Sequence, residues 1–456
     1  MDIREKKVLV FGSGISGESA CRLLLGEGAE VVLYDGNDRL DRKEILEKIS
    51  PAEGQHVEIL LGELTEQQLE GLLDELSLVV MSPGVPTDLP IVERMREHGL
   101  PIWGEIELAY VFGRGDVLAI TGTNGKTTTT ALLGEIMKNY KDSVFVVGNI
   151  GNPYTSAVPE TTPESVVVAE ISSFQLETIH TFRPKVSAIL NITPDHLNRH
   201  HTMQAYIEAK ERIAENQTEE DVCVLNYEDE ETRAFGEKTR AQVLYFSSRR
   251  KLKKGVYLED GTIICDIDER IPVCSVSELN ILGTHNHENA MAAVAMAYAY
   301  GTPMEIIRKT LKEFQGVEHR IEFVAEKNGV AYYNDSKGTN PDAAIRGIKA
   351  MNRPTVLIGG GYDKESSYDE WIQAFDGKVK KLVLLGATRE KIAETARRLG
   401  FSEIEMADTF EEAFAKCVEY AQPGDAVLLS PACASWGMFK NYEERGDKFK
   451  ELVNQL

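Results

Sequence analysis

The residues best suited to chemistry lie in a glycine- and threonine-rich stretch at 119–130, which reads AITGTNGKTTTT. The usual phosphate loop has four residues between its first glycine and the Gly-Lys pair, whereas this stretch has two. The apolar run at 117–120 predicts a strand before the loop, and a helix is expected from Lys126 onward. In that setting backbone amides and Lys126 hold a phosphate, and Thr127 ligates Mg²⁺. We therefore expect a shortened loop that binds a nucleoside triphosphate.

A second glycine-rich turn follows the apolar run at 8–11. It reads G-x-G-x-x-G at Gly12, Gly14 and Gly17, and Asp35 ends the next strand. This fingerprint is typical of a dinucleotide site and of an NAD-dependent dehydrogenase, although it supports a nucleotide diphosphate rather than a nicotinamide. The alternative is a turn that only packs a helix on a strand. The turn at 82–86, SPGVP, is expected to line the same crevice.

Oxygen and nitrogen ligands for a metal follow two later strands. Glu170 ends the apolar run at 166–169, and a carboxylate there suits octahedral Mg²⁺. A helix-capping acid before Ser172 is the alternative interpretation. His196 follows the next strand, with His200 and His201 nearby, but no thiolate or carboxylate has the spacing of a zinc site, so zinc is disfavoured.

Three further polar turns follow strand-like stretches near the end of the chain, at 332–341, 359–364 and 430–436. Each carries hydroxyl or charged groups, and together they predict a pocket for a small, polar, charged substrate. Asp335 and Lys337 are candidates for ribose and phosphate contacts, although an ordinary polar turn would look similar. Lys210, by contrast, has the local pattern of a solvated helix lysine.

The elements that must position these residues alternate between strand and helix, which indicates an α/β fold with mainly parallel sheets. Three series are expected, as domains 1–104, 105–316 and 317–456. Strands are predicted at 8–11, 31–34, 78–81, 117–120, 144–147, 166–169, 188–190, 329–333, 356–358, 381–385 and 426–429. Helices are predicted near 287–300, 389–399 and 409–421.

The composition of the chain excludes several classes of protein. The chain has 456 residues and a formal net charge of −23, so broad attraction to nucleic acid or to an anionic membrane is disfavoured. Six scattered cysteines without a C-x-x-C pair favour reduced thiols buried as small apolar residues. The longest apolar run, 290–300, is too short to cross a bilayer, and no signal-peptide pattern opens the chain. We expect a cytoplasmic protein.

The combined motifs resemble the Mur ligase family of peptidoglycan synthesis. The resemblance covers the chain from end to end, and it rests on the order of its motifs more than on any one of them. These motifs are GTNGKTT at 122–128, GNIG at 148–151, EISSFQLE at 170–177, Asp195-His196, His319-Arg320, NDSKGTNP at 334–341 and SPACAS at 430–435.

The resemblance implies a Rossmann-like first domain, a central P-loop-type ATPase domain and a Rossmann-like last domain. It implies UDP-sugar binding by Gly12, Ser13, Gly14, Ile15, Ser16, Gly17, Asp35, Ser82, Pro83 and Gly84. It implies ATP binding by Gly122, Thr123, Asn124, Gly125, Lys126, Thr127, Thr128, Asn289, Arg320, Asp335 and Lys337. It implies D-glutamate binding by His196, Thr339, Lys364, Ser435, Trp436 and Tyr442, with Trp436 acting mainly through its backbone.

The resemblance also implies the catalytic groups, which are Lys126, Asn149, Glu170, His196 and Lys210. Two Mg²⁺ ions would be held by Thr127, Glu170, His196 and Lys210. Lys210 corresponds to a lysine that these ligases carbamylate with CO₂, which gives it a carboxylate that supports Mg²⁺. This implication replaces the solvated-surface interpretation of Lys210.

The implied reaction is ATP-dependent formation of an amide bond through an acyl phosphate, in cell-wall synthesis and hence in cell shape and division. The implied substrates are UDP-N-acetylmuramoyl-L-alanine, D-glutamate and ATP, with no nucleic-acid or membrane partner and a monomeric enzyme. The D-N-P-R motif of diamino-acid-adding members is absent, which favours the glutamate-adding branch. The alternatives are a family member that adds another amino acid, an NAD-dependent dehydrogenase, and a nucleotide-dependent switch or transport ATPase.

Overall fold

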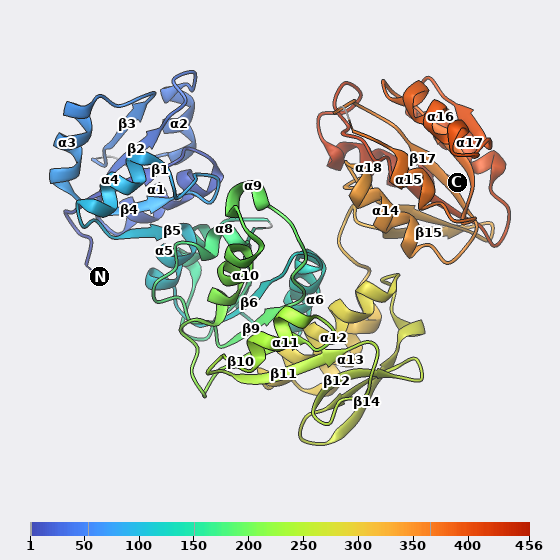
Figure 1. Cartoon of the computed structure of the whole chain (residues 1–456), viewed down its shortest axis with the longest axis horizontal. Coiled ribbons are helices and arrows are strands. Elements are labelled where there is room, and N and C mark those ends of the chain that lie inside the picture. Colours follow the sequence, from blue (N-terminus) through green and yellow to red (C-terminus); the bar gives the residue numbers. More distant parts are fainter. Residues whose placement is uncertain (1, 53, 150, 365) are drawn as a thin grey trace. The chain divides into compact units, whose positions relative to one another are not determined.

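A computed structural model describes residues 2–52, 54–149, 151–364 and 366–456 (Figure 1). These residues form three sheets whose strands are mainly parallel, which confirms the predicted α/β class. The chain divides into two compact units. The first runs to Cys274 and includes Glu288–Thr310, and the second comprises Ser275–His287 and Leu311–Leu456. The first two sheets therefore belong to one unit.

The first sheet has the strand order β3-β2-β1-β4-β5, with all neighbours parallel. Its apolar strand residues are covered on both faces, as parallel sheets require. The strands are β1 (Lys7–Phe11), β2 (Glu30–Asp35), β3 (Val57–Leu61), β4 (Leu76–Met81) and β5 (Ile102–Gly104). The helices are α1 (Ile15–Gly26), α2 (Arg42–Ile49), α3 (Glu66–Glu75), α4 (Pro90–Glu97) and α5 (Glu105–Phe112).

The central sheet has the order β14-β13-β12-β11-β10-β9-β6-β8-β7. Its strands are β6 (Asp116–Thr121), β7 (Val144–Gly148), β8 (Val166–Glu170), β9 (Val186–Ile189), β10 (Val222–Asn226), β11 (Gln242–Ser247), β12 (Gly255–Glu259), β13 (Thr262–Asp266) and β14 (Arg270–Ser275). The strands from β6 to β12 pair in parallel, whereas β13 is antiparallel to β12. The parallel pairing places the residues after β7, β8, β6 and β9 at one edge of the sheet.

Short helices follow the strands of this sheet and carry most of its polar loops. They are α6 (Lys126–Lys138), α7 (Tyr154–Ala157), α8 (Ser173–Leu176), α9 (Leu197–His200), α10 (Met203–Glu211) and α11 (Glu230–Gly236). The alanine-rich α12 (Thr284–Ala299) is confirmed close to its predicted bounds and is followed by α13 (Met304–Glu313).

A buried carboxylate joins the first sheet's helices to the central sheet. Oε1 of Glu105, in α5, accepts hydrogen bonds from the backbone N–H and the hydroxyl of Thr155, in α7, at 2.7 and 2.9 Å. The Thr155 hydroxyl also contacts the Ser19 hydroxyl of α1 at 2.9 Å. These contacts link α1, α5 and α7 within the first unit.

The second unit contains the six-stranded sheet β15-β16-β20-β17-β18-β19. Its strands are β15 (Glu322–Lys327), β16 (Val330–Asn334), β17 (Thr355–Gly359), β18 (Val379–Leu384), β19 (Ile404–Met406) and β20 (Ala426–Leu429). Its helices are α14 (Pro341–Ala350), α15 (Asp369–Gln373), α16 (Arg389–Arg398), α17 (Phe410–Tyr420) and α18 (Tyr442–Asn454). The strands β16, β20 and β17 are neighbours and run in parallel.

One expectation from composition agrees with the structure. All six cysteine side chains are buried. Across the described part of the chain, no helix is both long enough and apolar enough to cross a membrane.

Candidate active site

The phosphate loop joins β6 to α6 in the strand–loop–helix setting that the sequence predicts. Gly122 and Gly125 have φ of 147° and 87°, so both use backbone conformations that favour glycine. A Cβ on Gly125 would lie 2.2 Å from Oδ1 of Asn289, a predicted ATP contact from α12. Asn289 therefore packs closely against the short loop, and α6 begins at the residue that follows Gly125.

Two lysines meet behind this loop. Nζ of Lys126 donates to the carbonyl oxygens of Gly122 and Thr123 at 2.9 and 3.1 Å, and Nζ of Lys210 donates to the Gly122 carbonyl at 2.8 Å. Lys210 is 2% exposed, so its interpretation as a solvated helix lysine is wrong. Burial, together with the charge of Lys126, lowers the pKa of Lys210 to about 7. A sizeable fraction of its amine is thus neutral near neutral pH.

Glu170 lies at the end of β8, next to the phosphate loop's strand. It is 1% exposed, and its Oε1 accepts a hydrogen bond from Nδ2 of Asn149 at 2.8 Å. Among the described residues, Oε2 of Glu170 has no hydrogen-bond partner. The alternative role as a helix cap is wrong, because Ser172 and Gln175 form the capping box of α8. A buried carboxylate oxygen without a partner is well suited to a cation.

The three histidines considered for zinc each have a different polar partner. His196, at the start of α9, has a half-exposed side chain whose Nε2 lies 3.5 Å from Oδ2 of Asp195. His200 is buried, with Nε2 2.9 Å from the Ser173 hydroxyl, and burial lowers its pKa. His201 is exposed and lies 3.3 Å from Asp88. The disfavoured zinc site gains no support from these contacts.

Hydrogen bonds from neighbouring side chains hold the first glycine turn in place. Oδ2 of Asp35 accepts hydrogen bonds from the backbone N–H and the hydroxyl of Ser13 at 2.9 and 2.7 Å. Burial raises the pKa of Asp35, but these hydrogen bonds outweigh it and lower the pKa overall. The Ser82 hydroxyl donates to the Gly12 carbonyl at 3.1 Å, so the two turns expected to share a crevice do lie together.

In the second unit, the three polar turns follow three neighbouring strands. The turn at 334–341 follows β16, the turn at 430–436 follows β20, and the turn at 359–364 follows β17. Backbone bonds join them: the Gly360 N–H donates to the Pro431 carbonyl at 2.8 Å, and the Asp335 N–H donates to the Leu429 carbonyl at 2.7 Å. The sequence placed these turns at strand ends, and the sheet order makes them adjacent.

A buried acid lies at the centre of these turns. Oδ2 of Asp335 accepts a hydrogen bond from the Ser430 hydroxyl at 2.6 Å, and burial raises the pKa of Asp335 to about 7. Cations of the same unit contact aromatic faces nearby. Nζ of Lys364 lies 4.9 Å from the Trp436 ring centroid, and Nζ of Lys337 lies 5.4 Å from that of Tyr442. Two pairs of residues that the sequence assigns to substrate binding are therefore in contact, Lys364 with Trp436 and Lys337 with Tyr442.

Sequence reasoning missed several residues that hold the loops. Asn191 accepts from the Asn124 N–H and donates back to the Asn124 carbonyl, at 2.9 and 3.1 Å, and the Tyr206 hydroxyl lies 3.0 Å from that of Thr123. Arg445, 1% exposed, donates to Ser336 and to the Cys433 carbonyl. Asn191 could have been recognised, because it is a polar residue in the turn that follows a strand. Arg445 could not, because its sequence context is that of any charged residue of an amphipathic helix.

Comparison with known proteins identifies the family. Three family models match in chain order: "Mur ligase MurD-like, N-terminal domain" at 6–104, "Mur ligase middle domain" at 120–297 and "Mur ligase, glutamate ligase domain" at 319–433. The chain is 58% identical to a protein of Lachnoclostridium phytofermentans named UDP-N-acetylmuramoylalanine--D-glutamate ligase, over 100% of this chain and 99% of that protein. The chain belongs to the Mur ligase family. A protein of the same name from Lachnospira eligens is 55% identical, over the full length of both chains.

Solved structures of Mur ligases share the fold. The ligase MurC from Thermotoga maritima, a UDP-N-acetylmuramate-alanine ligase, aligns with a TM-score of 0.59 at 21% identity, over 99% of both chains. The MurF ligase from Thermotoga maritima, in complex with ADP, aligns with a TM-score of 0.57 at 17% identity, over 100% of this chain and 97% of that one. At these identities the likeness extends to the fold alone, and it confirms the α/β architecture.

Proposed function

We propose that this Mur ligase adds D-glutamate to UDP-N-acetylmuramoyl-L-alanine with consumption of ATP. The observation that carries the proposal is that the neighbouring strands β6, β8 and β7 lead at one edge of the sheet to the loop with Lys126, to Glu170 and to Asn149. Full-length relatives that bear the name of this activity support the choice of substrates.

The reaction proceeds in two steps. An oxygen of the alanyl carboxylate attacks the γ-phosphorus of ATP, ADP leaves, and an acyl phosphate forms. The amine of D-glutamate then attacks the acyl carbon, phosphate leaves, and the nitrogen loses a proton. The contribution of this chain is to position the groups and to offset their negative charge, through Lys126 and the amides at the start of α6.

Mg²⁺ fits the first unit, because Oε2 of Glu170 is buried and has no hydrogen-bond partner among the described residues. Such an oxygen is suited to bind a cation. Glu170, Thr127, His196 and a modified Lys210 are the residues that would hold it. When bound, Mg²⁺ offsets the charge that develops on the transferred phosphoryl group. Asn149 keeps the Glu170 carboxylate oriented through its hydrogen bond.

Carbamylation of Lys210 is part of the proposal. The neutral amine is the form that attacks CO₂, forming a nitrogen–carbon bond and releasing a proton, and the lowered pKa of Lys210 favours that form. The product has a negative charge, which the adjacent Lys126 would stabilise.

The remaining expectations follow from the same assignment. We expect residues 1–104 to bind the UDP-sugar, 105–316 to bind ATP and 317–456 to bind the amino acid and nucleotide. We expect a cytoplasmic monomer that acts on small molecules.

The deciding experiment measures phosphate release from ATP with UDP-N-acetylmuramoyl-L-alanine and a panel of D- and L-amino acids, and identifies the product by mass. Release that depends on D-glutamate and yields the glutamyl product supports the proposal. Release that depends on a different amino acid would assign the chain to another Mur-type activity. Release without an acceptor would favour an ATPase or switch, and turnover of NAD would favour a dehydrogenase.

A further inference from the structure

One carboxylate joins three separate segments of the first unit. Oε2 of Glu177, which follows α8, accepts a hydrogen bond from Nη2 of Arg199 at 2.7 Å and from the Thr87 hydroxyl at 3.2 Å. The same Nη2 of Arg199 donates to the Val85 carbonyl at 3.1 Å. The side chains of Arg199 and Glu177 are only 13% and 16% exposed, so solvent screens their interaction weakly.

These contacts connect two parts of the proposed active site. Val85 and Thr87 belong to the turn that follows β4 and that also contains Ser82. Arg199 belongs to α9, a helix that begins directly after His196. The turn is expected to bind the UDP-sugar, and His196 is expected to bind Mg²⁺ and D-glutamate. Ser82, Pro83, Val85, Thr87, Phe174 and Arg199 line one small cavity, so side chains of the turn, of α8 and of α9 meet there.

The helix that carries Arg199 needs support from outside. His196 and His201 flank the four-residue α9 with φ of 52° and 64°, which non-glycine residues seldom adopt. The Phe174 ring lies against this segment, with its centroid 4.9 Å from that of His196 and 5.0 Å from Cζ of Arg199. The segment therefore keeps its conformation through contacts with α8 and the turn at 82–87.

We propose that Arg199 and Glu177 are positioning residues for the ligase reaction. They hold the His196 segment at a fixed separation from the turn at 82–87, so that the carboxylate of a substrate bound at the turn is aligned with the groups that His196 is expected to bind. This inference rests on the proposed function and deepens it. The alternative is an ion pair that stabilises the fold without affecting catalysis.

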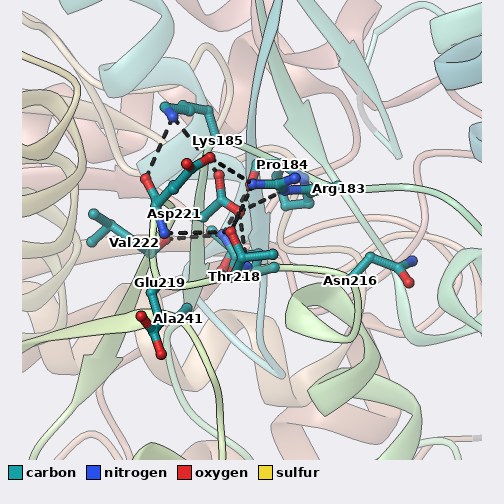
Figure 2. A network of polar contacts seen from close by, with 12 residues as sticks. Arg183, Pro184, Lys185, Asn216, Thr218, Glu219, Asp221, Val222 and Ala241 are labelled. Carbon is teal, nitrogen blue, oxygen red and sulfur yellow. Dashed lines mark hydrogen bonds and ion pairs between the residues drawn. The ribbon is translucent and has the colours of Figure 1, made fainter.

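The chain offers a matched control, the ion pair of Arg183 with Asp221. Nε of Arg183 lies 2.6 Å from Oδ2 of Asp221, and Thr218 completes the network. Figure 2 shows Asp221 facing the Arg183 guanidinium, with Lys185 beside it. This network lies where β9 and β10 begin, whereas the phosphate loop lies beyond the carboxyl ends of the parallel strands.

The experiment compares Arg199→Met, Arg199→Lys and Glu177→Gln with Arg183→Met, using D-glutamate-dependent phosphate release. Wild-type protein is assayed first, so that failure of the proposed function is seen before any variant is interpreted. For Arg199→Met and Glu177→Gln we expect kcat to fall about 100-fold, as for loss of alignment at a reacting centre, with the KM for ATP changed less than about twofold. Arg199→Lys, whose ammonium can donate to both acceptors, should recover at least about tenfold of that loss.

Arg183→Met should lower the Tm and leave kcat within about twofold of wild type. If Arg199→Met lowers the Tm but keeps the wild-type kcat, the pair is only structural and the inference is overturned. Should Arg199→Met fail to fold, Thr87→Val decides the question, because it removes one hydrogen bond to Glu177 and should lower kcat about 2- to 10-fold. An unchanged kcat in Thr87→Val would then overturn it.

Discussion

Lys126 and Lys210 donate hydrogen bonds to the same backbone carbonyl, that of Gly122. Lys126 is the first residue of α6 and Lys210 belongs to α10, so 84 positions of sequence separate two side-chain nitrogens that donate to one oxygen. Burial of Lys210 and repulsion from Lys126 both favour the neutral amine. Under the proposed function, one arrangement would serve both phosphate binding at the loop and modification of the lysine behind it.

The first prediction concerns this shared carbonyl. Replacing Lys126 with Gln removes the neighbouring charge, so the pKa of Lys210 should rise above about 7 while remaining below 10.5, because burial is the larger cause of its shift. The titration midpoint can be followed by NMR of ¹³C-labelled lysine side chains. Lys185→Gln, at the other edge of the sheet, is the control and should leave the midpoint unchanged. A midpoint that falls in Lys126→Gln would contradict the prediction.

The second prediction concerns Glu170. Glu170→Gln retains an oxygen that can accept from Asn149 but removes the buried negative charge, so the variant should be more stable than wild type without Mg²⁺, by about 1 kcal/mol. Ligase activity should fall about 100- to 1,000-fold, as for loss of one electrostatic contact to a transition state. Calorimetry with and without Mg²⁺ provides the check, since Mg²⁺ should raise the Tm of wild type and not of the variant. Equal Mg²⁺ stabilisation of both proteins would remove Glu170 from the metal site.

The third prediction concerns the pH dependence of stability. The folded-state pKa of Asp335 is raised to about 7 from 3.8, so the folded protein binds more protons than the unfolded chain between these values. Its contribution to stability is therefore present below about pH 4 and is lost as the pH rises to about 7, by up to about 1.4 kcal/mol per pH unit.

Asp335→Asn removes this dependence. The Tm of the variant minus that of wild type should therefore increase from pH 5 to pH 7. The exposed Asp342, in the same unit, supplies the control, and Asp342→Asn should give a difference that stays nearly flat. A difference for Asp335→Asn that decreases over this range would rule out a raised pKa.

Several strands were predictable because their residues form apolar runs that are buried on both faces. The run at 426–429 coincides with β20, and the runs at 356–358 and 117–120 lie inside β17 and β6. The strands β3, β5, β10 to β15 and β19 were not predicted. Of these, β3, β5, β15 and β19 are short or only partly buried, so they lack the continuous apolar run that distinguishes a strand from a loop. The strand β10 is buried and apolar, and its pattern was not recognised.

The sequence predicted which turns belong to the candidate site, but it did not predict which of them lie next to one another. Gly-rich and polar turns after strands are a local pattern, and the family resemblance assigned their roles. Their adjacency depends on strand order, which crossovers set over long stretches of chain. The burial of Lys210 and the bridge from Glu177 to Thr87 likewise depend on contacts between distant segments, and no local pattern reveals them.

The last prediction concerns the shortened phosphate loop. Gly125→Ala should destabilise the first unit by about 2–4 kcal/mol, because a Cβ would lie 2.2 Å from Oδ1 of Asn289 and φ is 87°. Two controls separate these causes. Gly151 also has a positive φ, 64°, but open space around its Cβ position, so Gly151→Ala should cost about 1 kcal/mol. Gly14→Ala has neither problem and should be nearly neutral. Thermal unfolding and ATP binding by calorimetry provide the measurement. If Gly125→Ala and Gly151→Ala lose equal stability, steric enclosure by Asn289 does not explain the short loop.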